Sequence, residues 1–192
     1  MKFDRVLAAA GCGMAALVLG GCAAMDWGTH LAHFNYTADD RKDAVILIAG
    51  GAPEQCGANP TSIRLLADGN HSPLMASGSM GFNSKLDTSM YPDHQGVLMA
   101  MRVPAGHYRV FPYPFNAVNF RPVEIPIADI TVSAGEVVYV GEMYLQTACD
   151  FTSVVTYRDE FDRDMKLLKA QNPALAQASI QKRILVPRKE IP

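Results

Sequence analysis

Two short turns that resemble each other constrain the fold of this chain more than any other feature. The first is Pro104-Ala105-Gly106 and the second is Ser133-Ala134-Gly135, and each lies between two runs rich in apolar and β-branched residues. Proline presets φ for the first position of a turn, and glycine accepts the left-handed conformation. Because a type I turn followed by a glycine bulge joins antiparallel neighbours, we predict a tight hairpin at each place.

Short apolar runs, several of them alternating with a period of two, extend this β pattern along the chain. We predict strands at 44–49, 62–67, 96–103, 107–112, 123–132, 136–147, 151–157 and 180–186. A helical period occurs at about 159–171, where Asp159 is the expected cap, Asp162 compensates the helix dipole and Asn172-Pro173 ends the helix. The expected fold is therefore mainly β: an antiparallel β-sandwich of about seven or eight strands with one C-terminal amphipathic helix.

Two of these strands carry more detailed expectations. The apolar phase of 123–132 shifts between Ile127 and Ile130, which predicts a bulge or a change of sheet at Ala128-Asp129. Alternation along 136–147 places Glu142 on the face opposite to a set of apolar side chains. That set is Val137, Tyr139, Met143 and Leu145.

The N-terminus has the pattern of an export signal. A charged start precedes an apolar run from residue 6 to residue 19, and the run ends in Leu19-Gly20-Gly21-Cys22. Cysteine directly after Leu-Gly-Gly resembles the lipobox of bacterial lipoproteins, and this resemblance implies acylation of Cys22 and removal of residues 1–21. An uncleaved membrane helix at 6–25 and ordinary soluble export are the alternatives.

These signals divide the chain into a signal peptide (1–21), a lipidated N-terminus and tether (22–42), one β domain (43–187) and a tail (188–192). His30 and His33 are expected to be solvated in the tether. Ala23 follows the lipidated cysteine, which in the enterobacterial sorting pattern favours the outer membrane, facing the periplasm. The chain has 17 Lys and Arg against 19 Asp and Glu, so we expect no surface for nucleic acid.

A second resemblance covers residues 44–157. The motifs Val103-Pro104-Ala105-Gly106-His107-Tyr108 and Ala134-Gly135-Glu136-Val137-Val138-Tyr139-Val140-Gly141, together with the lipobox, are similar to those of bacterial lipoproteins of the DUF2846 type. That resemblance implies a small transthyretin-like or immunoglobulin-like β-sandwich in the cell envelope. It implies no catalytic residue.

Two cysteines besides the lipidation candidate remain in the mature chain, Cys56 and Cys149. Each follows a predicted strand, and the periplasm is oxidising, so we predict a disulfide between them. Two separately buried thiols are the alternative.

Metal-binding and catalytic signals are weak. The mature chain has no nucleophile elbow, P-loop, dinucleotide fingerprint or zinc motif, and Gly50-Gly51 is interpreted as the exit of a strand. The irregular stretch 68–95 is rich in methionine and histidine, the soft ligands that suit copper(I). His71, His94 and Met90 are its candidate ligands, but their spacing matches no compact copper site. We therefore expect no cofactor.

The candidate binding residues lie in a proline-rich connection between two predicted strands. They are Tyr113, Phe115, Phe120 and Arg121. Exposed aromatic and arginine side chains often anchor a partner, although Phe115 and Phe120 could instead close the end of the sandwich.

Three functions are compatible with these patterns. The first is a membrane-anchored periplasmic binding module with an envelope protein or the cell wall as partner, which requires exposed aromatic residues and no buried titratable cluster. The second is a copper-binding lipoprotein. The third is an envelope enzyme, which requires a pocket with paired, perturbed side chains. We expect the first of these and no enzymatic activity.

Overall fold

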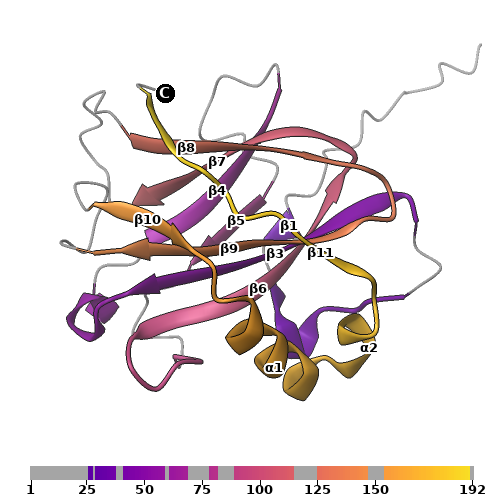
Figure 1. Cartoon of the computed structure of the whole chain (residues 1–192), viewed down its shortest axis with the longest axis horizontal. Coiled ribbons are helices and arrows are strands. Elements are labelled where there is room, and N and C mark those ends of the chain that lie inside the picture. Colours follow the sequence, from indigo (N-terminus) through magenta and orange to yellow (C-terminus); the bar gives the residue numbers. More distant parts are fainter. Residues whose placement is uncertain are drawn as a thin grey trace, which may run out of the picture.

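The computed structural model describes residues 26–27, 29–37, 41–58, 61–68, 78–81, 89–114, 125–146 and 154–190. Within them the chain is mainly β, with two sheets and a C-terminal helix (Figure 1). The first sheet has the strand order β1-β5-β4-β7-β8-β12, and the second has the order β10-β9-β3-β6-β2 with β11 beside β9. The strands of the first sheet are β1 (Asp26–Trp27), β4 (Thr61–Ala67), β5 (Gly78–Gly81), β7 (Gly106–Pro114), β8 (Ile125–Val132) and β12 (Arg188–Glu190). Those of the second are β2 (Thr29–His30), β3 (Asp43–Ala52), β6 (Gln95–Pro104), β9 (Val137–Leu145), β10 (Val155–Arg158) and β11 (Ile180–Lys182).

The helices lie on the side of the second sheet that faces away from the first sheet (Figure 1). They are α1 (Phe161–Gln171) and α2 (Pro173–Ala176), and two short 3-10 turns are η1 (Leu31–His33) and η2 (Glu54–Ala58). The predicted helix is confirmed as α1, and Asp159 accepts a hydrogen bond from the Phe161 amide at 3.3 Å. Asn172 both ends α1 and caps α2, since its side chain accepts a hydrogen bond from the Leu175 amide.

Six of the predicted strands are confirmed as β3, β4, β6, β7, β8 and β9. Only part of 151–157 forms a strand, β10, because it begins at Val155 and residues 151–153 lie outside the described part. The strand predicted at 180–186 is β11, which ends at Lys182, and the expected tail contains β12. The C-terminal segment therefore leaves the edge of β9 in the second sheet and reaches β8 in the first.

The prediction of two hairpins is wrong. Neither β6 and β7 nor β8 and β9 are neighbours in a sheet, since each turn carries the chain from one sheet to the other. Gly135 has the left-handed φ of +76°, whereas Gly106 does not have a positive φ. The first corner is closed instead by Tyr108, whose hydroxyl donates a hydrogen bond to the Pro104 carbonyl oxygen at 2.7 Å. Turn residues specify a reversal of the chain but not the edge that the returning strand joins.

The second sheet is mixed rather than antiparallel. β3 runs parallel to β9 and antiparallel to β6, and β11 also runs parallel to β9. In the first sheet, β1 and β5 are parallel as well. The chain passes through the first sheet between β3 and β9, and such a crossover connection permits the parallel pairing.

The irregularity expected at Ala128-Asp129 does not exist, because β8 pairs with β7 in continuous register there. Ile127 is buried on the opposite face of the strand, in a small cluster with Leu66 and Phe111. The shift in the apolar pattern therefore reflects local cover of this second face at Ile127, since Asp129 and Thr131 on the same face are exposed.

A bulge occurs instead in β9. Leu47 of β3 pairs with Tyr139 of β9, and Ala49 of β3 pairs with Glu142 of β9. Two steps along β3 therefore correspond to three steps along β9. Gly141 lies in this extra step and has a φ of +96°, a value that glycine adopts without strain. The bulge changes which side chains share a face, and Tyr139 and Glu142 both point toward α1. The expected alternation of 136–147 holds on each side of the bulge, where Val137 shares a core with Tyr139 and Met143 with Leu145, but it is wrong across the bulge.

Two apolar cores result from this arrangement. The larger core takes side chains from both sheets, for example Ile46 of β3, Ile63 of β4 and Val110 of β7. The smaller core lies between the second sheet and the helices and includes Tyr139 and Leu168.

The smaller core also contains Leu31 and Phe34, which are 0% and 8% exposed. Residues that were expected to form a free tether therefore pack on the domain, because they supply apolar side chains that α1 and α2 leave room for. His33 is exposed, as expected, while the side chain of His30 lies outside the described part. No helix among the described residues has the length and apolar character needed to span a bilayer.

Candidate functional site

A polar cluster lies under the first turn of α1, where the helix faces the bulge of β9. It is built from six side chains that come from β9, from α1 and from the turn before β6: Tyr91, His94, Tyr139, Glu142, Arg163 and Asp164. The side chains of Glu142 and Asp164 are completely buried, and that of His94 is 6% exposed. Buried charges are rare unless they are paired, so this cluster is the most unusual feature of the described interior.

His94 makes a hydrogen bond with a carboxylate at each ring nitrogen. Its Nδ1 lies 2.7 Å from Asp93 Oδ1, and its Nε2 lies 2.9 Å from Glu142 Oε1. A neutral imidazole has only one N–H, so two carboxylate acceptors require the protonated ring. Burial alone lowers the pKa of His94, but the hydrogen bond and charge of Glu142, followed by those of Asp93, raise it above its ordinary value. His94 also stacks on Tyr91, with ring centres 4.6 Å apart.

Arg163 links the two buried carboxylates. Its Nε donates a hydrogen bond to Asp164 Oδ1 at 2.8 Å, and its Nη2 lies 3.4 Å from Glu142 Oε1. Its guanidinium carbon lies 4.0 Å from the centre of the Tyr91 ring. Two cations thus neutralise two completely buried anions, which is the condition for keeping such charges inside a protein.

Two tyrosine hydroxyls complete the coordination of Asp164. Tyr91 donates to Oδ1 at 3.0 Å and Tyr139 donates to Oδ2 at 2.7 Å. Burial, followed by the charge of Asp164, raises the pKa of both tyrosines, so both hydroxyls remain donors. Every oxygen of Glu142 and Asp164 therefore has a partner within the cluster.

The turn at residues 89–96 positions Tyr91 and His94. The Ser89 hydroxyl oxygen accepts hydrogen bonds from the amides of Tyr91 and Gly96 at 3.2 and 3.0 Å, and the hydroxyl lies 2.7 Å from the His94 carbonyl oxygen. Met90 belongs to the same turn, and its sulfur accepts a hydrogen bond from the Leu98 amide at 3.3 Å. One serine thus organises the segment that brings two aromatic rings to the cluster.

Gly51 of β3 provides the space for the cluster. A Cβ at this position would lie 2.5 Å from Glu142 Oε1, 2.8 Å from Tyr144 Cδ2 and 3.1 Å from His94 Cδ2. Any side chain here would therefore displace the carboxylate. Gly51 was interpreted as part of a strand exit, but it lies within β3 and is buried.

Chemically, the cluster holds charge in place rather than exposing it. Its carboxylates are sealed and fully hydrogen-bonded, and neither ring nitrogen of His94 has a free lone pair for a metal. The sequence pattern did not predict the cluster. It assigned Asp162 to the compensation of the helix dipole, whereas the buried acidic residue of α1 is Asp164, two positions later. Gly51 within a buried strand was the available signal.

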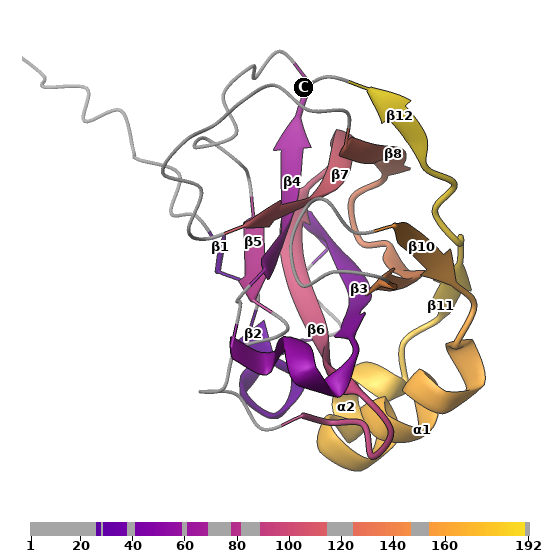
Figure 2. The same cartoon turned by 90° about the vertical axis from the view of Figure 1, so that its left-hand side faces the viewer.

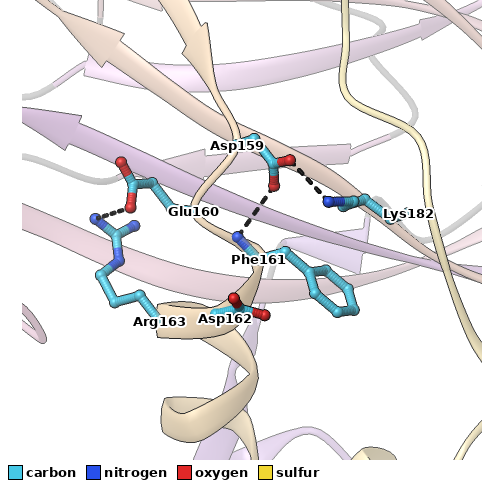
Figure 3. A pocket seen from close by; sticks show the side chains of 6 residues that line it. All are labelled: Asp159, Glu160, Phe161, Asp162, Arg163 and Lys182. Atoms are coloured by element: carbon cyan, nitrogen blue, oxygen red, sulfur yellow. Dashed lines mark hydrogen bonds and ion pairs between the residues drawn. The ribbon is translucent and has the colours of Figure 1, made fainter.

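Beside the cluster, a surface cavity of about 260 Å³ opens at the start of α1 (Figure 3). The side chains around it are Asp159, Glu160, Phe161, Asp162, Arg163 and Lys182. Lys182 Nζ lies 2.8 Å from Asp159 Oδ2, and the Lys182 ammonium lies 5.4 Å from the centre of the Phe161 ring. Arg163 is 30% exposed and belongs both to this cavity and to the buried cluster.

Several predicted site residues lie outside the described part of the chain: Cys22, His71, Phe115, Phe120, Arg121 and Cys149. Tyr113 is in β7, where it pairs with Ser62, but its side chain is not among those described. Cys56 is 1% exposed and takes part in a disulfide, and its pairing with Cys149 stays a prediction.

As metal ligands, His94 and Met90 are not supported, because both donate or accept hydrogen bonds inside the protein. Among the described residues, no group of three or more His, Cys, Asp or Glu side chains is arranged to hold a metal ion. Comparisons with protein-family models, with curated proteins and with solved structures find no match for this chain.

Proposed function

We propose that this protein is a lipid-anchored binding module of the bacterial envelope. The anchor is Cys22, on the pattern Leu19-Gly20-Gly21-Cys22, and the binding domain is the two-sheet body that follows it. Acylation would hold such a domain at a membrane, since each buried methylene contributes about 0.8 kcal/mol. The expected membrane is the outer membrane, with the domain in the periplasm.

The sandwich arrangement is part of this proposal. Its support is the shared core, in which Ile46 and Val138 of the second sheet occupy one cluster with Ile63, Val110 and Ile130 of the first. The two turns that change sheet, at Ala105 and at Ala134, are of the kind that joins facing sheets. In such folds the connections at the ends of the sheets carry recognition, while the sheets hold them in place.

The observation that carries a binding rather than a catalytic function is the closure of the buried cluster. A general acid or base has to reach a substrate, whereas Glu142 and Asp164 are completely buried and each of their oxygens already has a partner in the cluster. The expectation that a binding module has no buried titratable cluster is wrong for this protein. The role that fits the geometry of the cluster is a structural one: it fixes α1 on the second sheet. The proposed contact residues remain Tyr113, Phe115, Phe120 and Arg121, which follow or end β7.

Crosslinking in cells tests this proposal. The lipidated protein is crosslinked in intact cells and its neighbours are identified, for the natural chain and for a Tyr113→Ala, Phe115→Ala, Phe120→Ala variant. Val186→Ala is the control, because Val186 is also a large apolar residue and is 81% exposed. We expect the triple variant to fold and to lose specific neighbours that the control keeps.

Two results would contradict the proposal. A folded triple variant that captures the same neighbours as the natural chain would exclude the aromatic residues as the contact surface. A mass spectrum of the mature N-terminal peptide without acyl groups on Cys22 would exclude the anchor.

A further inference from the structure

The segment between the lipidation candidate and β3 is docked on the domain. We call its described residues, 26–27 and 29–37, the N-terminal strap. Asp26 and Trp27 form β1 and pair with β5, and Thr29 and His30 form β2 and pair with β6. After β2, Leu31 and Phe34 are buried in the smaller core. The strap thus has two strand pairings and two buried side chains.

Two polar side chains that do not belong to the strap donate hydrogen bonds to its backbone carbonyl oxygens. Asn172, which is 8% exposed, donates from Nδ2 to the carbonyl oxygens of Leu31 at 2.9 Å and Phe34 at 2.8 Å. Arg102 of β6 donates to the Asn35 carbonyl oxygen at 2.9 Å, and its guanidinium lies 5.5 Å from the centre of the Phe34 ring. Asn172 lies between α1 and α2, so the strap is clamped between the helices and the second sheet.

Docking shortens the reach of any anchor on Cys22. Asp26, the first strap residue, is four residues after Cys22, and a chain of that length spans at most about 14 Å. If the strap were free, the first fixed residue would be Asp43, 21 residues after Cys22, and an extended chain of that length spans about 70 Å. The docked strap therefore leaves almost no spacer between lipid and domain.

We infer that the domain of the lipidated protein lies directly on a phospholipid bilayer, with the β1–β5 edge of the first sheet toward the lipid. This inference rests on the proposed acylation of Cys22. It also orients the domain, because β1 and β12 are at opposite edges of the first sheet (Figure 2). Five strand spacings separate these edges, about 24 Å at the usual spacing between strands.

Energy transfer between two labelled positions and the bilayer tests the orientation. A donor dye is attached to His33→Cys in the strap or to Val186→Cys in the segment before β12; both native residues are exposed. The lipidated protein is placed in vesicles of phosphatidylethanolamine and phosphatidylglycerol that carry an acceptor dye on the headgroup. We expect transfer from the His33 position to exceed transfer from the Val186 position by at least twofold.

Two variants change, in different ways, the length of free chain between Cys22 and the first docked residue. An insertion of twelve glycine and serine residues between Met25 and Asp26 lengthens the spacer and leaves the strap docked, so the difference between the two labels should disappear. Asn172→Ala removes the clamp, so transfer should fall and the amides of residues 31–36 should exchange with solvent at least tenfold faster. Gln171→Ala, at the neighbouring position, is the control and should change neither measurement.

The inference is overturned if the natural protein shows equal transfer from both labels, or if the insertion leaves the transfer from both labels unchanged. It is also overturned if the amides of residues 31–36 exchange at the rate of an unfolded chain. Mass spectrometry of the same sample separates this failure from that of the proposed function. An unmodified Cys22 removes both the anchor and the lipid contact, whereas an acylated Cys22 with equal transfer removes only the lipid contact.

Discussion

Replacement of Gly51 by alanine tests the packing of the buried cluster directly. The new methyl group would lie 2.5 Å from Glu142 Oε1 and 2.8 Å from Tyr144 Cδ2, so the carboxylate has to move away from His94. Overpacking costs about 1–3 kcal/mol, and the loss of a hydrogen bond to a charged group costs about 1.5–3 kcal/mol. The smaller unfolded-state entropy of alanine offsets about 0.4–1 kcal/mol. We expect Gly51→Ala to lower the free energy of unfolding by about 2–5 kcal/mol, from the combination of these effects.

The assay is urea unfolding of the purified protein, followed by the signal of its single Trp, Trp27, and by circular dichroism. A loss of this size corresponds to a fall in Tm of roughly 4–20 °C for a chain of this length. Gly106→Ala is the matched control, because its nearest contact would be Tyr108 Cε2 at 3.6 Å and its φ is not positive. That variant should stay within about 1 kcal/mol of the natural chain.

A double-mutant cycle identifies the cause of the loss. If the methyl group acts on the Glu142 carboxylate, Gly51→Ala should cost at least about 1 kcal/mol less in a Glu142→Ala background than in the natural one. Equal stability of the Gly51→Ala and Gly106→Ala variants would refute the reasoning. Simple additivity with Glu142→Ala would show that the methyl group does not act through that carboxylate.

Three further predictions follow from the contacts described above. The raised pKa of His94 means that protonation favours the folded state, so this stabilisation is complete below the ordinary pKa of 6.5 and is lost as the pH rises through the folded-state value. The free energy of unfolding should therefore fall as the pH rises above 6.5 in the natural chain but not in His94→Gln, and parallel curves would contradict this. Tyr139→Phe should lower the free energy of unfolding by about 1.5–3 kcal/mol, because it removes a donor to the buried Asp164 carboxylate. Tyr108→Phe loses only a hydrogen bond to a carbonyl and should cost about 0.5–1.5 kcal/mol. The reverse order in chemical denaturation would contradict this reasoning. Reduction should lower stability by about 4–5 kcal/mol if Cys56 and Cys149 close their loop of about 90 residues, and a thiol titration that finds both cysteines free before reduction would refute the bridge.

The elements of this fold could be predicted from the sequence because their signals are local. Alternation of apolar residues located β6 and β7, and the change to a helical period located α1, since both patterns depend on neighbours within a few positions. Asn172-Pro173 ended that helix where expected for the same reason. The N-terminal lipidation signal is equally local, and it remains a prediction.

The arrangement of these elements could not be predicted in the same way. The turns at Ala105 and Ala134 looked like hairpins because a turn sequence specifies only a reversal of the chain. Whether the next strand stays in the sheet or joins the other one depends on which surface buries more apolar area, and that is a property of the whole core. The same reason explains the strap, since Leu31 and Phe34 are buried only because α1 and α2 leave a site for them.

The buried cluster shows the division most clearly. The chain order alone places a glycine at position 51 and acidic residues at the start of α1, and local rules predict only a strand exit and compensation of the helix dipole there. The fold adds what no local pattern contains: one extra residue in β9 turns Glu142 to the side of Tyr139, where Arg163 and His94 can neutralise it. A charge is stable inside a protein only when partners distant in the sequence surround it, and no local pattern contains that information.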